Sequence, residues 1–469
     1  MLIMRHELLL VIITVILLLV EIFLPDNRKT AIIFPSILLF FIVTVLGFIP
    51  GPTGELFGGM YATTPLILTM KNILNLGVLI IFIQSVSWLK KSENKGKIGE
   101  YYLILLSTLT GMDYMISSGD FLMFYVGLEL ATIPLATLAA WERFKERSAE
   151  AGVKMIFISA LSSGILLYGI SMIYGTTGSV YFNEVRSAFN ATPLQVLAFI
   201  FFFAGLAFKI AIVPFHLWIA DVYEGAPINI TSYLSVISKG AAVFILMIIL
   251  YTVFYKIALL WRDVLYVTSI LTMTIGNLFA IRQRNIKRFL AFSSISQAGF
   301  ILLGLIGQSQ LGMTTVIYFV LVYIFSNLGA FGVATVISNV TGKEVIDDYD
   351  GLYRTNPLLS LTMMLALFSL AGIPPVAGFF GKFFLFAAAA QKGLYILVFI
   401  GVLNTIISLY YYLLVVKAMF LNTSDQPIAY FRSDVYSRIG LLMCVAGIVI
   451  IGFASPVYEF ILNLSHGLY

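Results

Sequence analysis

Apolar segments of about 20 residues follow one another from one end of the chain to the other. Each segment is long enough to cross a hydrocarbon core about 30 Å thick as an α-helix. Only short polar connections separate these segments, and none is long enough for a separate soluble domain. The sequence therefore predicts an all-α integral membrane protein in which the membrane region is the whole chain.

Composition agrees with this fold class and excludes one alternative. Of 469 residues, 60% are hydrophobic and 11% are charged, and the mean hydropathy is +1.00. The net charge of +5 comes from basic residues in the short connections rather than on one face. We therefore expect the lipid bilayer, and no nucleic acid, as the surroundings of this chain.

We expect about 14 transmembrane segments, with uncertain ends. The first has a full spanning length and no small-residue cleavage site, so we expect it to remain in the mature protein. The expected segments cover residues 7–25, 30–49, 72–89, 101–118, 121–140, 154–174, 193–220, 228–254, 260–281, 290–307, 312–338, 357–390, 394–420 and 437–461.

Basic residues in alternate connections predict the orientation of the chain. One side collects most of the lysines and arginines, and membrane proteins keep these residues in their cytoplasmic loops. The richer side is therefore expected to be cytoplasmic, with both termini on the outer side. The basic residues assigned to the outer side are Arg5, Lys71, Arg186, Lys256, Arg262 and Lys392.

Cysteine and histidine usage excludes several redox groups. Cys444 is the single cysteine, whereas iron–sulfur clusters, c-type haem and cysteine zinc sites need more thiolates. His6, His216 and His466 lie far apart in the sequence, which disfavours a histidine-ligated metal or haem. We expect no redox cofactor and no metal in this chain.

Four ionisable residues lie well inside the expected segments. A lysine at the centre of a bilayer costs about 2.5 to 3.5 kcal/mol, and such residues usually mark ion or proton routes. Lys154 and Lys417 lie near segment ends, where their side chains can reach the interface, so we set them aside. The four candidates are Glu129, Lys209, Lys239 and Lys382.

Glu129 and Lys209 are each near mid-depth and could form a pair. A pair whose separation changes would pass a proton back and forth, whereas a fixed pair would only bridge two helices. Both readings stay open. Lys239 and Lys382 have no obvious carboxylate partner, which weakens the purely structural reading.

A polar stripe leads to Lys239. Thr231, Ser235 and Ser238 precede it at helical spacing, so ordered water and a proton wire are favoured along this face. Hydroxyl groups that only join helices are the alternative. His216 is a secondary candidate for a relay, and a histidine that is simply hydrogen-bonded in the core is the commoner case.

Prolines interrupt two of the expected segments. Pro214 frees the carbonyl of Ile210, and Pro374–Pro375 frees those of Leu370 and Ala371. Such backbone is tolerated at membrane depth only where protein or water satisfies it. We therefore expect broken helices beside Lys209 and Lys382, in the seventh and twelfth segments.

The two interruptions lie five segments apart, which is typical of inverted repeats in transporters. We expect two inverted five-helix units, made of segments four to eight and nine to thirteen. The corresponding division is 1–100, 101–254, 255–420 and 421–469. The match is imperfect, because segment ten has no acid to match Glu129. It offers Ser293, Ser294, Ser296 and Gln297 instead.

Three stretches resemble a known family. AFKIAIVPFHLWIADVYEGAP, AFSSISQAGF and LYRTNPLLSLTMMLALFSLAGIPPVAGFFGKF are similar to signatures of the antiporter-like membrane subunits of respiratory complex I, the proton-pumping NADH:quinone oxidoreductase, and of related cation/proton antiporters. A lysine in segment twelve and fourteen segments without a long lateral helix are most similar to the subunit N branch.

The resemblance implies roles that the residues alone do not give. It implies that Glu129 and Lys209 form an input pair, that Lys239 is the central relay and that Lys382 lies nearest the exit. It also implies that FMN, iron–sulfur clusters and quinone belong to partner subunits. The expected partners are the other membrane subunits of the complex, including neighbouring antiporter-like subunits, and the peripheral redox subunits. The expected location is a bacterial plasma (inner) membrane, with both termini on the periplasmic side.

Other readings of the sequence remain. The chain could belong to a sodium or potassium/proton antiporter, or to another antiporter-like subunit of the same complex, subunit M. It could also be a membrane scaffold whose lysines only bridge helices. The Gly-Lys pair in GFFGKF is no phosphate-binding loop, because Val376 stands where the first glycine is required.

Overall fold

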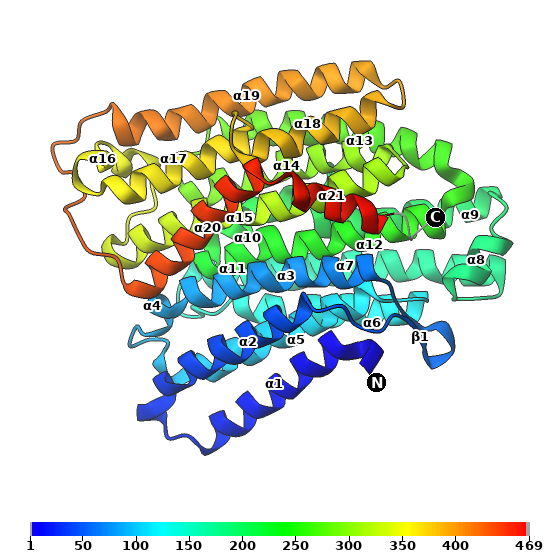
Figure 1. Cartoon of the computed structure of the whole chain (residues 1–469), viewed down its shortest axis with the longest axis horizontal. Coiled ribbons are helices and arrows are strands. Elements are labelled where there is room, and N and C mark those ends of the chain that lie inside the picture. The colour runs from blue at the N-terminus through cyan, green and yellow to red at the C-terminus, as the bar shows by residue number, and fades with distance from the viewer. Residues whose placement is uncertain (1, 466–469) are drawn as a thin grey trace.

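The computed structural model describes residues 2–465, and its long helices lie side by side along the long axis of the molecule (Figure 1). The start of α1, the β1–β2 hairpin and α8 lie at one end, and α4 and α16 lie at the other. The first elements are α1 (Arg5–Phe23), α2 (Ile33–Gly47), β1 (Gly54–Leu56), β2 (Tyr61–Thr63), α3 (Pro65–Gln84) and α4 (Val86–Leu89).

Two series of helices follow. A π-helical turn (Leu234–Ser238) joins α11 to α12. The first series is α5 (Ile98–Ile116), α6 (Phe121–Ala139), α7 (Glu146–Thr177), α8 (Phe182–Ala188), α9 (Pro193–Ile210), α10 (Leu217–Gly225), α11 (Ile228–Tyr233) and α12 (Lys239–Thr252). The second is α13 (Ala258–Ala280), α14 (Ile286–Ile306), α15 (Gln310–Thr341), α16 (Leu352–Thr355), α17 (Pro357–Ala371), α18 (Ala377–Ala390) and α19 (Tyr395–Phe420), before α20 (Val435–Phe453) and α21 (Ser455–Leu464).

The all-α membrane fold is confirmed. Within residues 2–465, 12 helical segments are long and apolar enough to cross a membrane. Two of the expected segments are not among these twelve. One is the expected fourth segment, which corresponds to the 19-residue α5 and carries Glu100 and Asp113. The expected twelfth segment corresponds to α17 and α18, with 15 and 14 residues, each too short to span alone.

Both expected helix breaks are confirmed. The first lies between α9 and α10 and contains Pro214, and the second lies between α17 and α18 and contains Pro374–Pro375. Each broken helix ends on a residue with left-handed backbone, Ala211 (φ 62°) and Gly372 (φ 88°).

The third helix begins earlier than we expected. α3 starts at Pro65, where the Thr64 side chain accepts a hydrogen bond from Ile67 N at 3.3 Å, rather than near residue 72. Lys71 is therefore fully buried inside the helix, and its assignment to an outer connection is wrong. The error arose because Lys71 and Asn72 interrupt the apolar run.

The interior of the molecule lies along α3, α11–α12, α14 and α15. The spanning windows of α14 and α15 are 100% buried and that of residues 228–252 is 94% buried, against 28% for the first helix. The helix that carries Lys239 therefore lies in the protein interior and not against lipid.

Candidate functional site

Lys239 lies at the start of α12, directly after the π-helical turn, and is 2% exposed. Its ammonium group donates to the hydroxyl and the carbonyl oxygen of Ser294 on α14, each at 2.9 Å. Across the described residues, no Asp or Glu pairs with Lys239. A buried lysine held only by neutral acceptors is a candidate proton carrier, and π-helical turns are frequent at functional sites.

The stripe that precedes Lys239 is polar, but one member differs from our expectation. Ser235 is fully buried and accepts a hydrogen bond from Asn327 at 2.9 Å, and Thr231 donates to the carbonyls of Tyr223 and Pro227. Ser238 is partly exposed instead of buried. The π-helical turn has more residues per turn than an α-helix, so the position before Lys239 no longer lies on the buried face.

Polar residues of α15 extend the network, and sequence reasoning missed them. Asn327 also donates to the hydroxyl of Tyr323 at 2.9 Å, and Ser326 shares a 2.7 Å hydrogen bond with Ser369 of α17. Tyr323, Ser326 and Asn327 recur at i, i+3 and i+4 within an apolar helix. That spacing is the signal that could have found them.

The side chain of Lys382, on α18, extends back toward the break between α17 and α18. Its ammonium group donates to the carbonyl of Ala371 at 3.1 Å and lies 4.4 Å from the centre of the Phe300 ring. The carbonyl of Leu370 accepts from Gln297 Nε2 at 3.0 Å. The two carbonyls that we expected the prolines to free are thus satisfied by Lys382 and by a side chain of α14.

A small cavity lies between the surroundings of Lys239 and those of Lys382. It has a volume of about 10 Å³, and its lining includes the side chains of Gln297, Tyr323, Ser326 and Ser369. That volume is about the size needed for one water molecule. Polar side chains of α14, α15 and α17 therefore meet at this cavity, between the π-helical turn and the break beside Lys382.

Glu129 and Lys209 are neighbours, but they do not form the direct pair that we considered. Lys209 donates to the Thr132 hydroxyl on α6 at 2.8 Å, and no ion pair within 4.0 Å joins these two described residues. Thr132 lies three residues after Glu129, on the same side of α6. One carboxylate oxygen of Glu129 is buried without a hydrogen-bond partner. Lys209 is thus hydrogen-bonded to a threonine hydroxyl and not to the carboxylate of Glu129.

His216 lies inside the first helix break and is 7% exposed. Its Nδ1 atom is buried and has no hydrogen-bond partner among residues 2–465. No hydrogen bond among the described residues connects Lys209 or His216 to Lys239. Lys209 and His216 therefore lie outside the hydrogen-bonded groups around Lys239 and Lys382.

An ion-pair cluster after the first break was also missed. Asp221 on α10 pairs with Lys154 at 2.6 Å and with Arg288 at 2.8 Å, and Glu224 pairs with Arg288 at 2.9 Å and with Arg147 at 3.0 Å. Lys154 is thus an ion-paired residue and not only an interfacial one. The cluster fixes α10 to α7 and to the start of α14.

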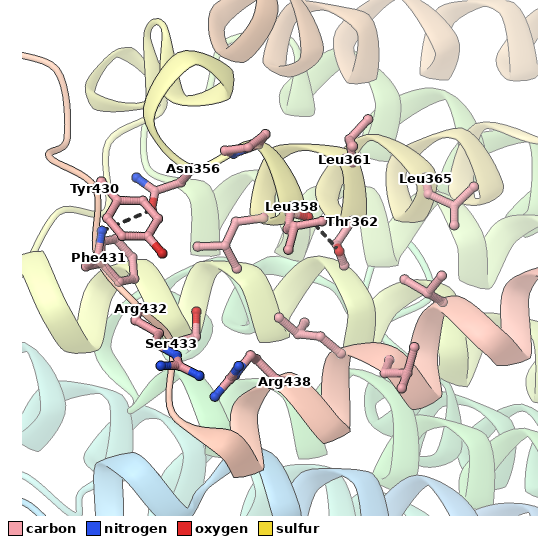
Figure 2. Close-up of a pocket in the computed structure, with 15 residues that line it drawn as sticks. Asn356, Leu358, Leu361, Thr362, Leu365, Tyr430, Phe431, Arg432, Ser433 and Arg438 are labelled. Atoms are coloured by element: carbon pink, nitrogen blue, oxygen red, sulfur yellow. Dashed lines mark hydrogen bonds between the residues drawn. The ribbon is translucent and has the colours of Figure 1, made fainter.

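A larger cavity lies away from Lys239 and Lys382. It has a volume of about 590 Å³ and lies between α17, α20 and the segment before α20 (Figure 2). Leucine is the commonest residue in its wall, and Arg432 and Arg438 lie at one end. Within residues 2–465, no group of three His, Cys, Asp or Glu could hold a metal ion, and His466 lies outside these residues.

Comparison with known proteins places this geometry in context. The membrane-protein family described as NADH:quinone oxidoreductase/Mrp antiporter matches residues 118–408. An NADH-quinone oxidoreductase subunit N from Phocaeicola vulgatus is 51% identical over 457 residues, which cover 97% of each chain.

Solved structures agree with this similarity. A chain of respiratory complex I from Thermus thermophilus is 28% identical, with a TM-score of 0.82 and 98% of each chain covered. A chain of the Mrp complex from Dietzia has a TM-score of 0.86 at 20% identity, and the match covers 99% of this chain and 97% of that one, so it shows the shared fold alone.

Proposed function

The chain belongs to the family of NADH:quinone oxidoreductase and Mrp antiporter membrane subunits, and we propose that it moves protons through Glu129, Lys209, Lys239 and Lys382. It is a proton-translocating membrane subunit of an NADH:quinone oxidoreductase and works with the other subunits of that complex. His216 is the secondary relay in this proposal.

The observation that carries the proposal is the polar network around Lys239. Burying an ammonium group without a carboxylate partner costs free energy in a membrane protein, and such residues usually have a functional role. Here Asn327 bonds to Ser235 in the turn before Lys239. Ser326, its neighbour in α15, bonds to Ser369 in the helix that ends at the break beside Lys382. This arrangement supports transfer from one lysine to the other, with a water in the small cavity between them.

Proton movement along this route depends on electrostatic repulsion between neighbouring protonated groups. A proton that reaches Lys239 repels the proton on the next lysine, so the groups titrate as a coupled set. Each proton moved against 100 mV costs about 2.3 kcal/mol. This chain holds no reductant in the proposal, so FMN, iron–sulfur clusters and quinone act in partner subunits, and neighbouring membrane subunits transmit the driving force.

The two inverted five-helix units are supported by a constant spacing between equivalent features. The 32-residue helices start at Glu146 and Gln310, and their left-handed end caps are Gly178 and Gly342. The broken helices start at Pro193 and Pro357. Each pair is separated by 164 residues. We propose the division 1–100, 101–254, 255–420 and 421–469 on this basis.

Lys239→Met and Lys382→Met test the proposed route. Both changes keep an unbranched side chain and remove the proton. In inside-out vesicles we expect NADH-driven proton uptake to fall by about tenfold or more, because a positioned proton donor contributes about 10² to 10⁴ to a transfer rate. Normal uptake by correctly assembled complexes would show that these lysines are not carriers.

Lys417→Met is the matched control. Lys417 is exposed near the end of α19, so the same substitution should leave proton uptake unchanged. The amount of assembled complex in each membrane is measured alongside, so that a loss of assembly is not mistaken for a loss of proton transfer.

The cofactor and partner assignments have their own test. We propose that the complex lies in a bacterial plasma membrane, with flavin and iron–sulfur polypeptides bound to it. Purification through a tag on this chain should yield those polypeptides and the absorbance of their cofactors. Small membrane partners alone would instead favour an antiporter powered by an ion gradient.

A further inference from the structure

A second buried ionisable cluster lies in the N-terminal helices, outside the proposed route. Lys71 on α3 is fully buried and forms an ion pair with Glu7 on α1, which is 1% exposed. The hydroxyl of Tyr61 donates to Glu7 at 3.1 Å and accepts from Lys71 at 3.2 Å. Asp113 on α5 is fully buried and interacts electrostatically with both Lys71 and Glu7.

The cluster contains more polar atoms than the chain satisfies. Both carboxylate oxygens of Asp113 are buried without a hydrogen-bond partner among residues 2–465. The same holds for both side-chain polar atoms of Asn72 and of Asn75, and for both ring nitrogens of His6. Buried polar groups are nearly always hydrogen-bonded to protein or ordered water. The pattern therefore points to a chain of water molecules through the cluster.

Charge counting shows that this cluster can hold a mobile proton. It has two carboxyl groups, Glu7 and Asp113, but one ammonium group, Lys71. Buried charges need compensation, so a neutral cluster requires one further proton. His6 or either carboxyl group can hold that proton, which gives it at least three positions. A simple structural ion pair has no such surplus carboxyl group.

The cluster is placed between the Lys239 segment and one end of the molecule. Asn75 lies one helical turn after Lys71 on α3, and α3 packs against α11 and the π-helical turn before Lys239. A side-chain carbon added to Gly77 would lie 2.5 Å from Ile237, which shows how close this approach is. On the other side, Tyr61 reaches the carbonyl of Ile3 at 3.4 Å, in the partly exposed N-terminal segment.

The β1–β2 hairpin covers the cluster at that end. Ala62 N donates to Ser117 O at 2.8 Å and Gly119 N donates to Met60 O at 2.7 Å, so the hairpin is fixed to the end of α5. In Figure 1 the hairpin and the start of α1 lie at the same end of the molecule. The cluster is thus enclosed, and Tyr61 is the group that connects it to the end of the molecule that carries the hairpin.

We propose that Asp113, Lys71 and Glu7 form a proton exit from the Lys239 segment to the end of the molecule that carries the hairpin. The inference deepens the proposed function and rests on it. In one transfer, Lys71 passes its own proton to Glu7 and takes the surplus proton from Asp113. Glu7 then releases a proton to water beside Tyr61, and a new proton reaches the Asp113 carboxylate through water. One proton crosses the cluster, and no electrons move.

A double variant separates this exit from a structural ion pair. Breaking a buried pair by removing one partner is strongly destabilising, whereas replacing both partners by neutral residues is often harmless. If the pair is structural, the double variant Glu7→Gln with Lys71→Met should assemble and pump normally. If it is an exit, the double variant should assemble but lose about tenfold or more of its NADH-driven proton uptake.

Two further variants keep the test decisive. Lys71→Arg keeps the positive charge beside Glu7 but cannot release its proton, so the exit predicts lost uptake and the structural pair predicts normal uptake. Asp113→Asn removes a carboxyl group that makes no ion pair, so it decides the question if the double variant does not assemble. Normal uptake by Asp113→Asn overturns the proposal.

Lys239→Met in the same experiment separates the two proposals. If Lys239→Met has lost proton uptake and the double variant pumps normally, the route through Lys239 stands and only the exit is wrong. If Lys239→Met pumps normally, the proposed function itself is wrong.

Discussion

The three lysines of the proposed route share one kind of partner. Lys209 donates to a threonine hydroxyl, Lys239 to the hydroxyl and carbonyl of one serine, and Lys382 to the carbonyl of Ala371. Hydrogen bonds from a charged donor to a neutral acceptor are weaker than those to a carboxylate. The proton on each lysine is therefore held firmly enough to be buried but not locked into a permanent ion pair.

The variant Thr132→Val tests the role of the neutral acceptor at Lys209. The change keeps the shape of the side chain and removes the acceptor of Lys209, where a hydrogen bond to a charged group contributes about 1.5 to 3 kcal/mol. We expect NADH-driven proton uptake to fall by about tenfold. Thr110→Val is the control, because the buried Thr110 donates to the carbonyl of Leu106 in the same way but has no lysine partner. If Thr132→Val and Thr110→Val lowered proton uptake equally, the role of Thr132 as the acceptor of Lys209 would be contradicted.

The sequence identified lysines in apolar surroundings but not their contacts. Lys239 and Lys382 stand alone in long apolar runs, so their burial could be predicted from hydropathy. Thr132 could not be singled out, because a threonine inside a membrane helix usually bonds its own backbone. Lys71 was misplaced because Lys71 and Asn72 interrupt the apolar run, so the helix was expected to begin after Lys71.

At the scale of the helix, side chains from α14 and α18 satisfy the free carbonyls of the second break. Pro374–Pro375 was predicted to free the carbonyls of Leu370 and Ala371, and these accept from Gln297 and Lys382. The break could be predicted because proline removes a donor from a known position. The side chains that donate to the freed carbonyls could not be predicted, because they depend on how α14 and α18 pack.

Gly372→Ala tests the link between helix end and lysine. Gly372 has φ 88°, and a side-chain carbon there would lie 3.0 Å from Lys382 Cδ. Left-handed backbone costs an alanine about 1 to 2 kcal/mol. Gly342→Ala is the control, because Gly342 ends α15 with φ 72° and an added carbon would meet nothing within 4 Å. Both changes should lower thermal stability similarly, but only Gly372→Ala should reduce proton uptake.

At the scale of the whole molecule, the order of the membrane helices was predictable and their depth in the bundle was not. Apolar length located nearly every helix, and the paired breaks suggested the repeat. Apolar length could not show that α3 enters the interior beside the π-helical turn, because a buried membrane helix and a lipid-facing one are equally apolar. The buried cluster at Lys71 depends on that placement.

The proposed orientation of the molecule can be tested with two matched cysteines. Cys444 is fully buried, so the natural thiol should be silent. Ser92→Cys lies in the connection after α4, and Ser187→Cys lies in α8 at the other end (Figure 1). Since basic loops stay in the cytoplasm, a membrane-impermeant thiol reagent added to intact cells should label Ser187→Cys alone. Both should react after permeabilisation, and labelling of Ser92→Cys from outside would reverse the orientation and make the hairpin end cytoplasmic.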